Sequence, residues 1–245
     1  MTPPDVPAPP ARFGAQNRSR ALQSEIMELI LERDLSAGDP LPTEVELAQA
    51  LGIGRNTLRE ALKVLQALGV VEIRHGFGMF VAPRNFDALT DGLTFRGRLS
   101  LRHEGQEATQ LVDVRQALEA GLIGEAMDLM TPEHLGVIEA SVRRMESAAL
   151  RGEVFTATDE QFHYQLFEPL DNELLSNLMS VFWKVYRKIH SELVGDPFLN
   201  LVETAAMHRG IFEAVEAGDK ALAATRLRCH FDGIRAELAK LGVAP

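Results

Sequence analysis

The sequence predicts a mainly α-helical protein with an N-terminal winged helix-turn-helix unit and a C-terminal all-helical bundle. One supporting observation is the stretch 41–81, which reads as a helix, a turn, a second helix and a short β-hairpin. The other is a series of helix-length segments after residue 107, without the alternation typical of strands. We therefore expect a disordered arm at 1–17, a winged unit at 18–82, a linker at 83–106 and a bundle at 107–241.

Length and composition set the broad class of the protein. A chain of 245 residues with 46% hydrophobic content can bury two modest cores. No apolar run approaches the roughly 18 residues that a membrane span needs. The single cysteine, Cys229, excludes an internal disulfide, and the N-terminus lacks a signal-peptide pattern. We expect a cytoplasmic protein with no membrane partner.

The net charge of −10 is unusual for a nucleic-acid-binding protein. Residues 1–84 hold 9 Lys and Arg against 10 Asp and Glu, whereas residues 85–245 hold 16 against 25. The acidity therefore belongs to the second part of the chain, and any affinity for DNA must come from locally placed cations.

The N-terminal part begins with an arm and one helix. Five prolines and few large apolar residues predict disorder in the arm. Leu22, Ile26, Leu29 and Ile30 recur at helical spacing and predict a helix over 18–33, which the segment 36–40 interrupts.

The next two helices form the predicted helix-turn-helix. Thr43 followed by Glu46 is a capping box that begins a helix, and the glycines of 51–54 allow the chain to reverse. One face of the helix over 53–68 is apolar, and the opposite face carries Arg55, Asn56, Arg59, Lys63 and Gln66. Cationic and amide side chains reach phosphates and base edges, although such a face is often only solvated. The hairpin that follows, over 70–81, is typical of a wing and favours DNA recognition.

The linker and the bundle follow. Residues 87–95 can form a short helix, and 96–104 can be a loop or its continuation. Arg96, Arg98 and Arg102 can contact DNA or cover acidic neighbours, and the sequence leaves both open. Beyond the linker, proline and glycine punctuation predicts helices at 107–129, 131–151, 154–169, 171–194, 198–217 and 219–241.

A second group of functional residues lies within the bundle. Asp159 and His163 are four residues apart on one apolar helix face, and His208 and His230 each align with large apolar neighbours. All three imidazoles therefore point inward, where an unpartnered one is costly. One carboxylate and three imidazoles suit Zn²⁺, or else Ni²⁺, Mn²⁺ or Fe²⁺, with coordination positions left open. Each histidine taken alone can equally be a hydrogen-bonded core residue.

Arg115 shares a helix face with Leu111, Leu118 and Leu122, so we expect it to point inward and to need an anion. An effector carboxylate and the nearby Glu119 are equally good partners. Farther along the chain, the aromatic residues 182, 183 and 186 can line a pocket or belong to the core.

The winged stretch resembles the GntR family of bacterial transcription regulators. The matching residues are Leu41-Pro42-Thr43-Glu44, Leu47-Ala48, Leu51-Gly52, Arg55, Leu58-Arg59-Glu60-Ala61-Leu62, Leu65, Gly69 and His75-Gly76-Phe77-Gly78-Met79-Phe80-Val81. The resemblance implies that operator DNA is contacted by Thr43, Glu44, Arg55, Asn56, Thr57 and Arg59, with His75 and Gly76 at the minor groove. Many members carry a guanine-reading arginine at the position of Val45, so the operator sequence is left open.

The bundle resembles the FCD effector domain of the same family. The similarity lies in Asp159-x-x-Phe162-His163, in His208 before Arg-x-Ile-x-x-Ala-x-x-x-Gly-Asp, and in His230. It implies that Asp159 and the three histidines bind a metal ion with a carboxylate effector beside it, near Arg115. Asn172 resembles a family asparagine near the effector, although helix capping explains it equally well.

The expected function is that of a non-enzymatic transcription regulator, in the first place a repressor. We expect a homodimer on a roughly palindromic, double-stranded operator, because one helix-turn-helix makes too few specific contacts. A small organic acid bound beside the metal ion would control operator affinity. Two alternatives use the same Asp/His site: metal-dependent hydrolysis and direct metal sensing.

Overall fold

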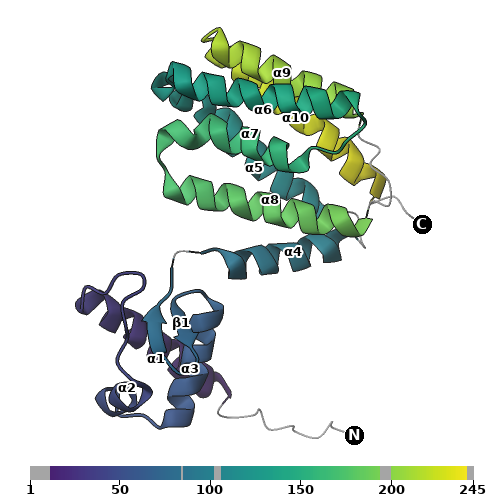
Figure 1. The fold of residues 1–245 in the computed structure, drawn as a ribbon. Helices are drawn as coiled ribbons and strands as arrows, with labels where there is room; N and C mark the ends of the chain where they lie inside the picture. The colour runs from purple at the N-terminus through teal and green to yellow at the C-terminus, as the bar shows by residue number, and fades with distance from the viewer. Residues whose placement is uncertain (1–11, 84, 102–105, 194–199, 242–245) are drawn as a thin grey trace, which may run out of the picture. The chain divides into compact units, whose positions relative to one another are not determined.

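The computed structural model describes residues 12–83, 85–101, 106–193 and 200–241. The chain divides into two compact units, Met1–Ala88 and Leu89–Pro245. Helices dominate both, and the described residues contain one two-stranded antiparallel hairpin (Figure 1). This confirms the predicted fold class. In the described part of the chain, every helix is too short or too polar to cross a membrane.

The part of the first unit that the structure describes forms three helices and the hairpin. They are α1 (Arg12–Glu32), α2 (Glu44–Ala50), α3 (Arg55–Ala67), β1 (Val71–Arg74) and β2 (Gly78–Val81). The strands pair from Val71 opposite Val81 to Arg74 opposite Gly78. Helix α1 begins at Arg12 rather than at Arg18, so it includes part of the expected arm. The alanine, glutamine and arginine of this stretch favour a helix.

The core of the first unit lies between the three helices and the wing. Apolar side chains from all of these elements pack together, including Leu22, Ile26, Leu47, Leu58, Leu62, Leu65, Val71 and Met79. The segment before α2 continues the sheet, because the Leu41 amide donates to the Met79 carbonyl over 2.8 Å. The wing is therefore fixed at its base, while its turn extends away from the core.

Helix α4 (Asp87–Leu101) lies almost wholly in the second unit, and it includes Arg96 and Arg98 in one continuous helix. Most of the expected linker is therefore helical. Helix α4 packs against α8, since a Cβ atom at Gly97 would lie 2.6 Å from Ile189 Cδ1. Arg96 donates to Glu107 over 2.5 Å, so it covers an acidic neighbour. Arg102 lies outside the described residues.

The described residues of the bundle form six further helices and a short 3₁₀ turn. They are α5 (Gln106–Leu129), α6 (Pro132–Leu150), α7 (Thr156–Phe167), η1 (Glu168–Leu170), α8 (Glu173–Leu193), α9 (Leu201–Glu216) and α10 (Lys220–Leu241). Their bounds lie within a few residues of the predicted ones. Helix α5 packs most extensively against α10, and α6 packs against α7 and α9. The core between them contains Ile123, Ile138, Phe162, Leu166, Ile211 and Leu227.

Candidate metal centre and nucleic-acid interface

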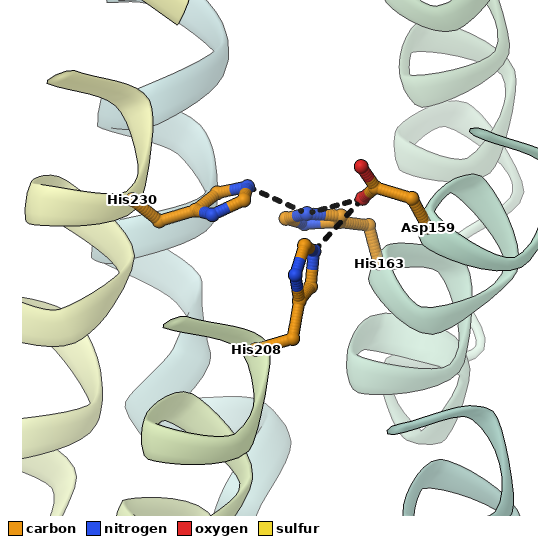
Figure 2. A group of neighbouring side chains, drawn as sticks. All are labelled: Asp159, His163, His208 and His230. Carbon is orange, nitrogen blue, oxygen red and sulfur yellow. Dashed lines mark hydrogen bonds and ion pairs between the residues drawn. The ribbon is translucent and has the colours of Figure 1, made fainter. Parts of the chain in front are cut away.

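Three helices bring the predicted Asp/His cluster together inside the bundle. Helix α7 carries Asp159 and His163 one turn apart, and α9 and α10 supply His208 and His230 (Figure 2). Each residue offers one potential ligand atom, and these atoms all lie within 4.8 Å of one another. The imidazoles of His163 and His208 are fully buried, whereas 19% of the Asp159 side chain is exposed. The cluster is therefore accessible from the aspartate side.

Hydrogen bonds fix the ring orientation of two of the histidines. His163 Nδ1 lies 2.6 Å from Glu119 Oε2, and His208 Nδ1 lies 2.7 Å from the Thr204 carbonyl oxygen. Both oxygens are acceptors, so in each histidine the Nδ1 atom carries the proton. The Nε2 atom of each ring therefore faces the centre of the cluster, where it can bind a proton or a metal ion. Metal-binding histidines typically have this arrangement, in which the other ring nitrogen donates to a carboxylate or carbonyl group.

The centre of the cluster requires a positive charge. Asp159 Oδ1 lies 2.9 Å from His208 Nε2 and 3.3 Å from His163 Nε2. His163 Nε2 also lies 3.3 Å from His230 Nε2. Acceptor atoms this close repel one another unless a proton or a metal ion lies among them. A carboxylate and three imidazoles match the ligands of Zn²⁺ and related ions, so these residues fit such an ion.

A buried ion pair supports the cluster from behind. Glu119 bridges His163 to Arg115, whose Nε atom donates to Glu119 Oε1 over 2.6 Å. The Glu119 side chain is fully buried, and 5% of the Arg115 side chain is exposed. Burial raises the pKa of Glu119, but the positive charges of Arg115 and His163 outweigh burial and lower it below its ordinary value. Glu119 therefore remains ionised and holds both neighbours.

The pKa values within the cluster also differ from their ordinary values. Burial raises the pKa of Asp159, but positive charge on His208 and hydrogen bonds from His163 and His208 lower it well below its ordinary value. Burial lowers the pKa of His230 well below its ordinary value, and repulsion from His208 and His163 adds to this effect. An ionised carboxylate beside a neutral imidazole is the protonation state that metal ligation needs.

A cavity of about 60 Å³ lies beside the cluster. Its lining includes Asp159 and His230, together with Trp183, Tyr186 and Thr204. One water needs roughly 10–15 Å³ on this scale, so the cavity can hold several waters or a small organic ligand.

Arg115 and Asn172 lie in different surroundings. Arg115 bridges to Glu119, one of the two partners that the sequence left open, and its Nη2 atom is buried and lacks a hydrogen-bond partner within the described residues. Asn172 is exposed and accepts from the Leu175 amide over 3.0 Å, so it caps α8. It lines a separate open groove beside α7 and is not among the residues that line the cavity at the cluster. The structure thus favours the capping interpretation of Asn172.

Helix α3 presents the predicted recognition face. Leu58, Ala61, Leu62 and Leu65 are buried, while Arg55, Asn56, Thr57, Arg59, Lys63 and Gln66 are exposed. Thr43 caps α2 in the predicted capping box, which fixes the helix before the turn. Glu44 pairs with Arg59 over 2.7 Å, linking the start of α2 to α3. This pair is largely exposed, so a DNA phosphate can compete for Arg59.

The wing tip is the other exposed part of this unit. His75, Gly76 and Phe77 are all exposed, and 84% of the Phe77 surface is accessible. Gly76 and Gly78 have φ angles of 80° and 114°, which favour glycine at both positions. The turn is therefore a short projection that is exposed to solvent, as entry into a narrow groove requires.

An exposed helix-turn-helix with a wing, followed in the chain by a helical bundle, is the architecture of a DNA-binding transcription regulator. Comparisons with known families agree with this class. Residues 18–81 match the family model "Bacterial regulatory proteins, gntR family", and residues 110–233 match the FCD domain. The chain belongs to the GntR family of transcription regulators and carries an FCD domain.

Individual relatives are similar over most of the chain. The HTH-type transcriptional regulator LutR of Bacillus subtilis is 27% identical over 84% of this chain and 94% of its own length. The galactonate operon transcriptional repressor of Escherichia coli is 26% identical over 74% of this chain and 80% of its own length. The solved structure of a Streptococcus agalactiae GntR protein aligns with a TM-score of 0.58 and 25% identity, covering 89% of this chain and 99% of that one.

Two features of the cluster could not be predicted from sequence. The contact between Glu119 and His163 joins residues on different helices, and no local pattern predicts that distance. Trp183 has a buried Nε1 atom without a partner in the described part of the chain. Its position at the cavity is likewise a product of tertiary packing.

Proposed function

We propose that this regulator is an operator-binding repressor that a small organic acid controls by binding beside a metal ion in the bundle. Asp159, His163, His208 and His230 would hold the metal ion. The observation that carries this proposal is the orientation of the cluster, in which the Nε2 atoms of the histidines and a carboxylate oxygen lie around one centre. A metal ion there would supply a Lewis-acidic position for a carboxylate oxygen.

The DNA-binding half of the proposal is supported by exposed polar groups on a rigid support. The proposed operator contacts are Thr43, Glu44, Arg55, Asn56, Thr57, Arg59, His75 and Gly76. Arginine and asparagine side chains on α3 suit guanine and adenine edges in the major groove, and the wing suits the minor groove. Two copies of the chain would bind a roughly palindromic site, since two-fold symmetry doubles the number of specific contacts.

The effector half is supported by the cavity at the cluster and by Arg115, whose guanidinium lies over Trp183 in the wall of that cavity. The unpartnered Nη2 atom of Arg115 is a buried cationic donor, which a carboxylate would satisfy. A relative of this chain is a repressor named for the operon of galactonate, which is itself an organic acid. Asn172, which the family resemblance suggests as an effector contact, caps α8 and lines a separate groove, so it does not add to this support. The two DNA-binding units of a dimer would have more than one relative arrangement. If the acid binds one arrangement more tightly than another, it would shift the equilibrium by that difference in affinity.

The first test measures metal content and acid binding together. The wild type, a His208→Ala/His230→Ala double variant and a His134→Ala control are purified and analysed for metal, then screened with organic acids by thermal shift. His134 belongs to the capping box of α6, so its loss leaves the cluster intact. We expect about one metal ion per chain in the wild type and control, none in the double variant, and acid stabilisation only with metal.

Other outcomes would separate the alternatives. Metal that is bound weakly and alters operator affinity without any acid would indicate a metal sensor. Turnover of esters or lactones by the metal-loaded protein would indicate a hydrolase. Equal metal content in all three proteins would contradict the assignment of His208 and His230 as ligands.

A further inference from the structure

The described bundle contains a second cavity next to the one at the Asp/His cluster. It has a volume of about 40 Å³ and lies between α5, α8 and α10. Tyr186 and Ile234 line both cavities, so the two share a wall. A ligand that begins at the cluster and passes these two side chains would enter the second cavity.

The second cavity is almost entirely apolar. Its walls include Ala108 and Val112 from α5, Val185 and Ile189 from α8, and Phe231 from α10. Arg115 is the only charged residue among the described residues that line it. Such a surface favours methylene groups, whereas a hydroxyl group placed there would lose its hydrogen bonds to water.

Arg115 lies where the polar and apolar regions meet. Its guanidinium carbon is 4.1 Å from the Trp183 ring centroid and 5.1 Å from that of Phe231. Trp183 lines the cavity at the cluster, and Phe231 lines the apolar one. Arg115 Nη2 and Trp183 Nε1 are both buried donors without a partner in the described part of the chain. A ligand with its acid group at this junction would satisfy donors that otherwise remain unpaired.

We propose that the effector is a monocarboxylic acid with an apolar substituent. Its carboxylate would lie in the cavity at the cluster, and its substituent would pass Tyr186 and Ile234 into the apolar cavity. This inference rests on the proposed function and narrows it to one ligand class. The volume of the second cavity corresponds to about three waters, which limits the substituent to a few carbon atoms.

The test is a calorimetric series on the metal-loaded full chain. The ligands are acetate, butyrate, hexanoate and octanoate, with gluconate as a polyhydroxy acid of similar size to hexanoate. Affinity should rise roughly threefold to fourfold for each added methylene until the cavity is full, and gluconate should bind no better than acetate. Equal or tighter binding of acetate or gluconate, relative to hexanoate, would overturn the inference.

Two variants change the cavity without touching the cluster. Ala108→Leu fills it and should weaken hexanoate binding by about tenfold while leaving acetate binding unchanged. Val185→Ala enlarges it and should improve octanoate binding relative to hexanoate, which keeps the test decisive if the filled variant misfolds. Ala140→Leu, at an exposed position of α6, is the matched control and should bind the series as the wild type does. Unchanged hexanoate binding by Ala108→Leu would contradict the inference.

The two levels of the proposal fail in different ways. If the metal-loaded protein binds no acid, or binds acids equally without metal, the proposed function is wrong and the inference fails with it. If short polar acids bind in a metal-dependent way and the cavity variants have no selective effect, the proposed function survives and only the ligand class is wrong.

Discussion

Arg59 in the winged unit and Arg115 in the bundle are each paired with a glutamate, but in opposite environments. Arg59 and Glu44 expose 58% and 33% of their side chains, whereas Arg115 and Glu119 expose 5% and 0%. Water and salt weaken the first pair, so Arg59 can exchange its partner for a phosphate. The second pair has no such freedom, because loss of either member leaves a buried charge. The exposed pair in the winged unit can therefore exchange partners, whereas the buried pair in the bundle keeps a fixed arrangement.

Removal of the buried glutamate should have the largest effect. Glu119→Ala leaves Arg115 without its partner and His163 without its hydrogen-bond acceptor, so we expect a loss of about 3–5 kcal/mol in the free energy of unfolding. Denaturant unfolding measures it. Glu44→Ala removes the corresponding exposed partner and should cost less than about 1 kcal/mol. Equal losses from the two variants would contradict the contrast between the pairs.

Metal removal should affect only the bundle. A ligand present at a thousand times its dissociation constant stabilises the folded state by about 4 kcal/mol, and a chelator would remove that contribution. We expect chelation to lower the melting temperature of the wild type and of His134→Ala, but not of the His208→Ala/His230→Ala variant. A similar fall in the double variant would mean that the metal binds elsewhere.

A substitution in the winged unit should change the affinity for DNA and leave the stability of the unit nearly unchanged. Arg59→Ala removes a proposed operator contact and should weaken binding to an operator selected from random DNA by about 1–3 kcal/mol. Its free energy of unfolding should change by less than about 1 kcal/mol, because the pair with Glu44 is exposed. Fluorescence anisotropy and denaturant unfolding measure the two quantities. Unchanged operator affinity would exclude Arg59 as a contact.

The smallest effects come from two glycines with open space around the position of a Cβ atom. Gly76 at the wing tip has a φ of 80°, so Gly76→Ala should strain the wing by about 1 kcal/mol and weaken operator binding a few-fold. Gly136 lies exposed within α6, so Gly136→Ala should stabilise the bundle by about 0.5–1 kcal/mol. Thermal unfolding and operator binding measure both variants. If both substitutions stabilised the protein, or both destabilised it, the result would contradict the backbone conformations assigned to Gly76 and Gly136.

The sequence predicts the elements better than their ends. Helical periodicity and the Thr43 capping box predicted the order of helices, because these signals are local. The start of α1 at Arg12 was not predicted, and the continuation of α4 through Arg96 was one of two alternatives that the sequence left open. Where such a helix begins or ends depends on its packing against other helices, as the close approach of Gly97 in α4 to Ile189 in α8 illustrates.

The candidate site divides in a similar way. Asp159 and His163 were found from their spacing on one helix, and His208 and His230 from their apolar neighbours and the family resemblance. The bridge from Arg115 to Glu119 was one of two open alternatives, because the residues are four apart. The contact of Glu119 with His163 and the adjoining apolar cavity arise from helices far apart in sequence, so no local pattern could predict them.

The most direct test of the central claim measures operator affinity against metal and acid together. Anisotropy titrations of the selected operator would use wild type and the His208→Ala/His230→Ala variant, each with and without metal and hexanoate. We expect the acid to weaken operator binding by the wild type about 5-fold to 150-fold, only when metal is present, and to leave the variant unaffected. Operator binding by the metal-loaded wild type that is indifferent to hexanoate, gluconate and every other acid in the screen would contradict control through this site.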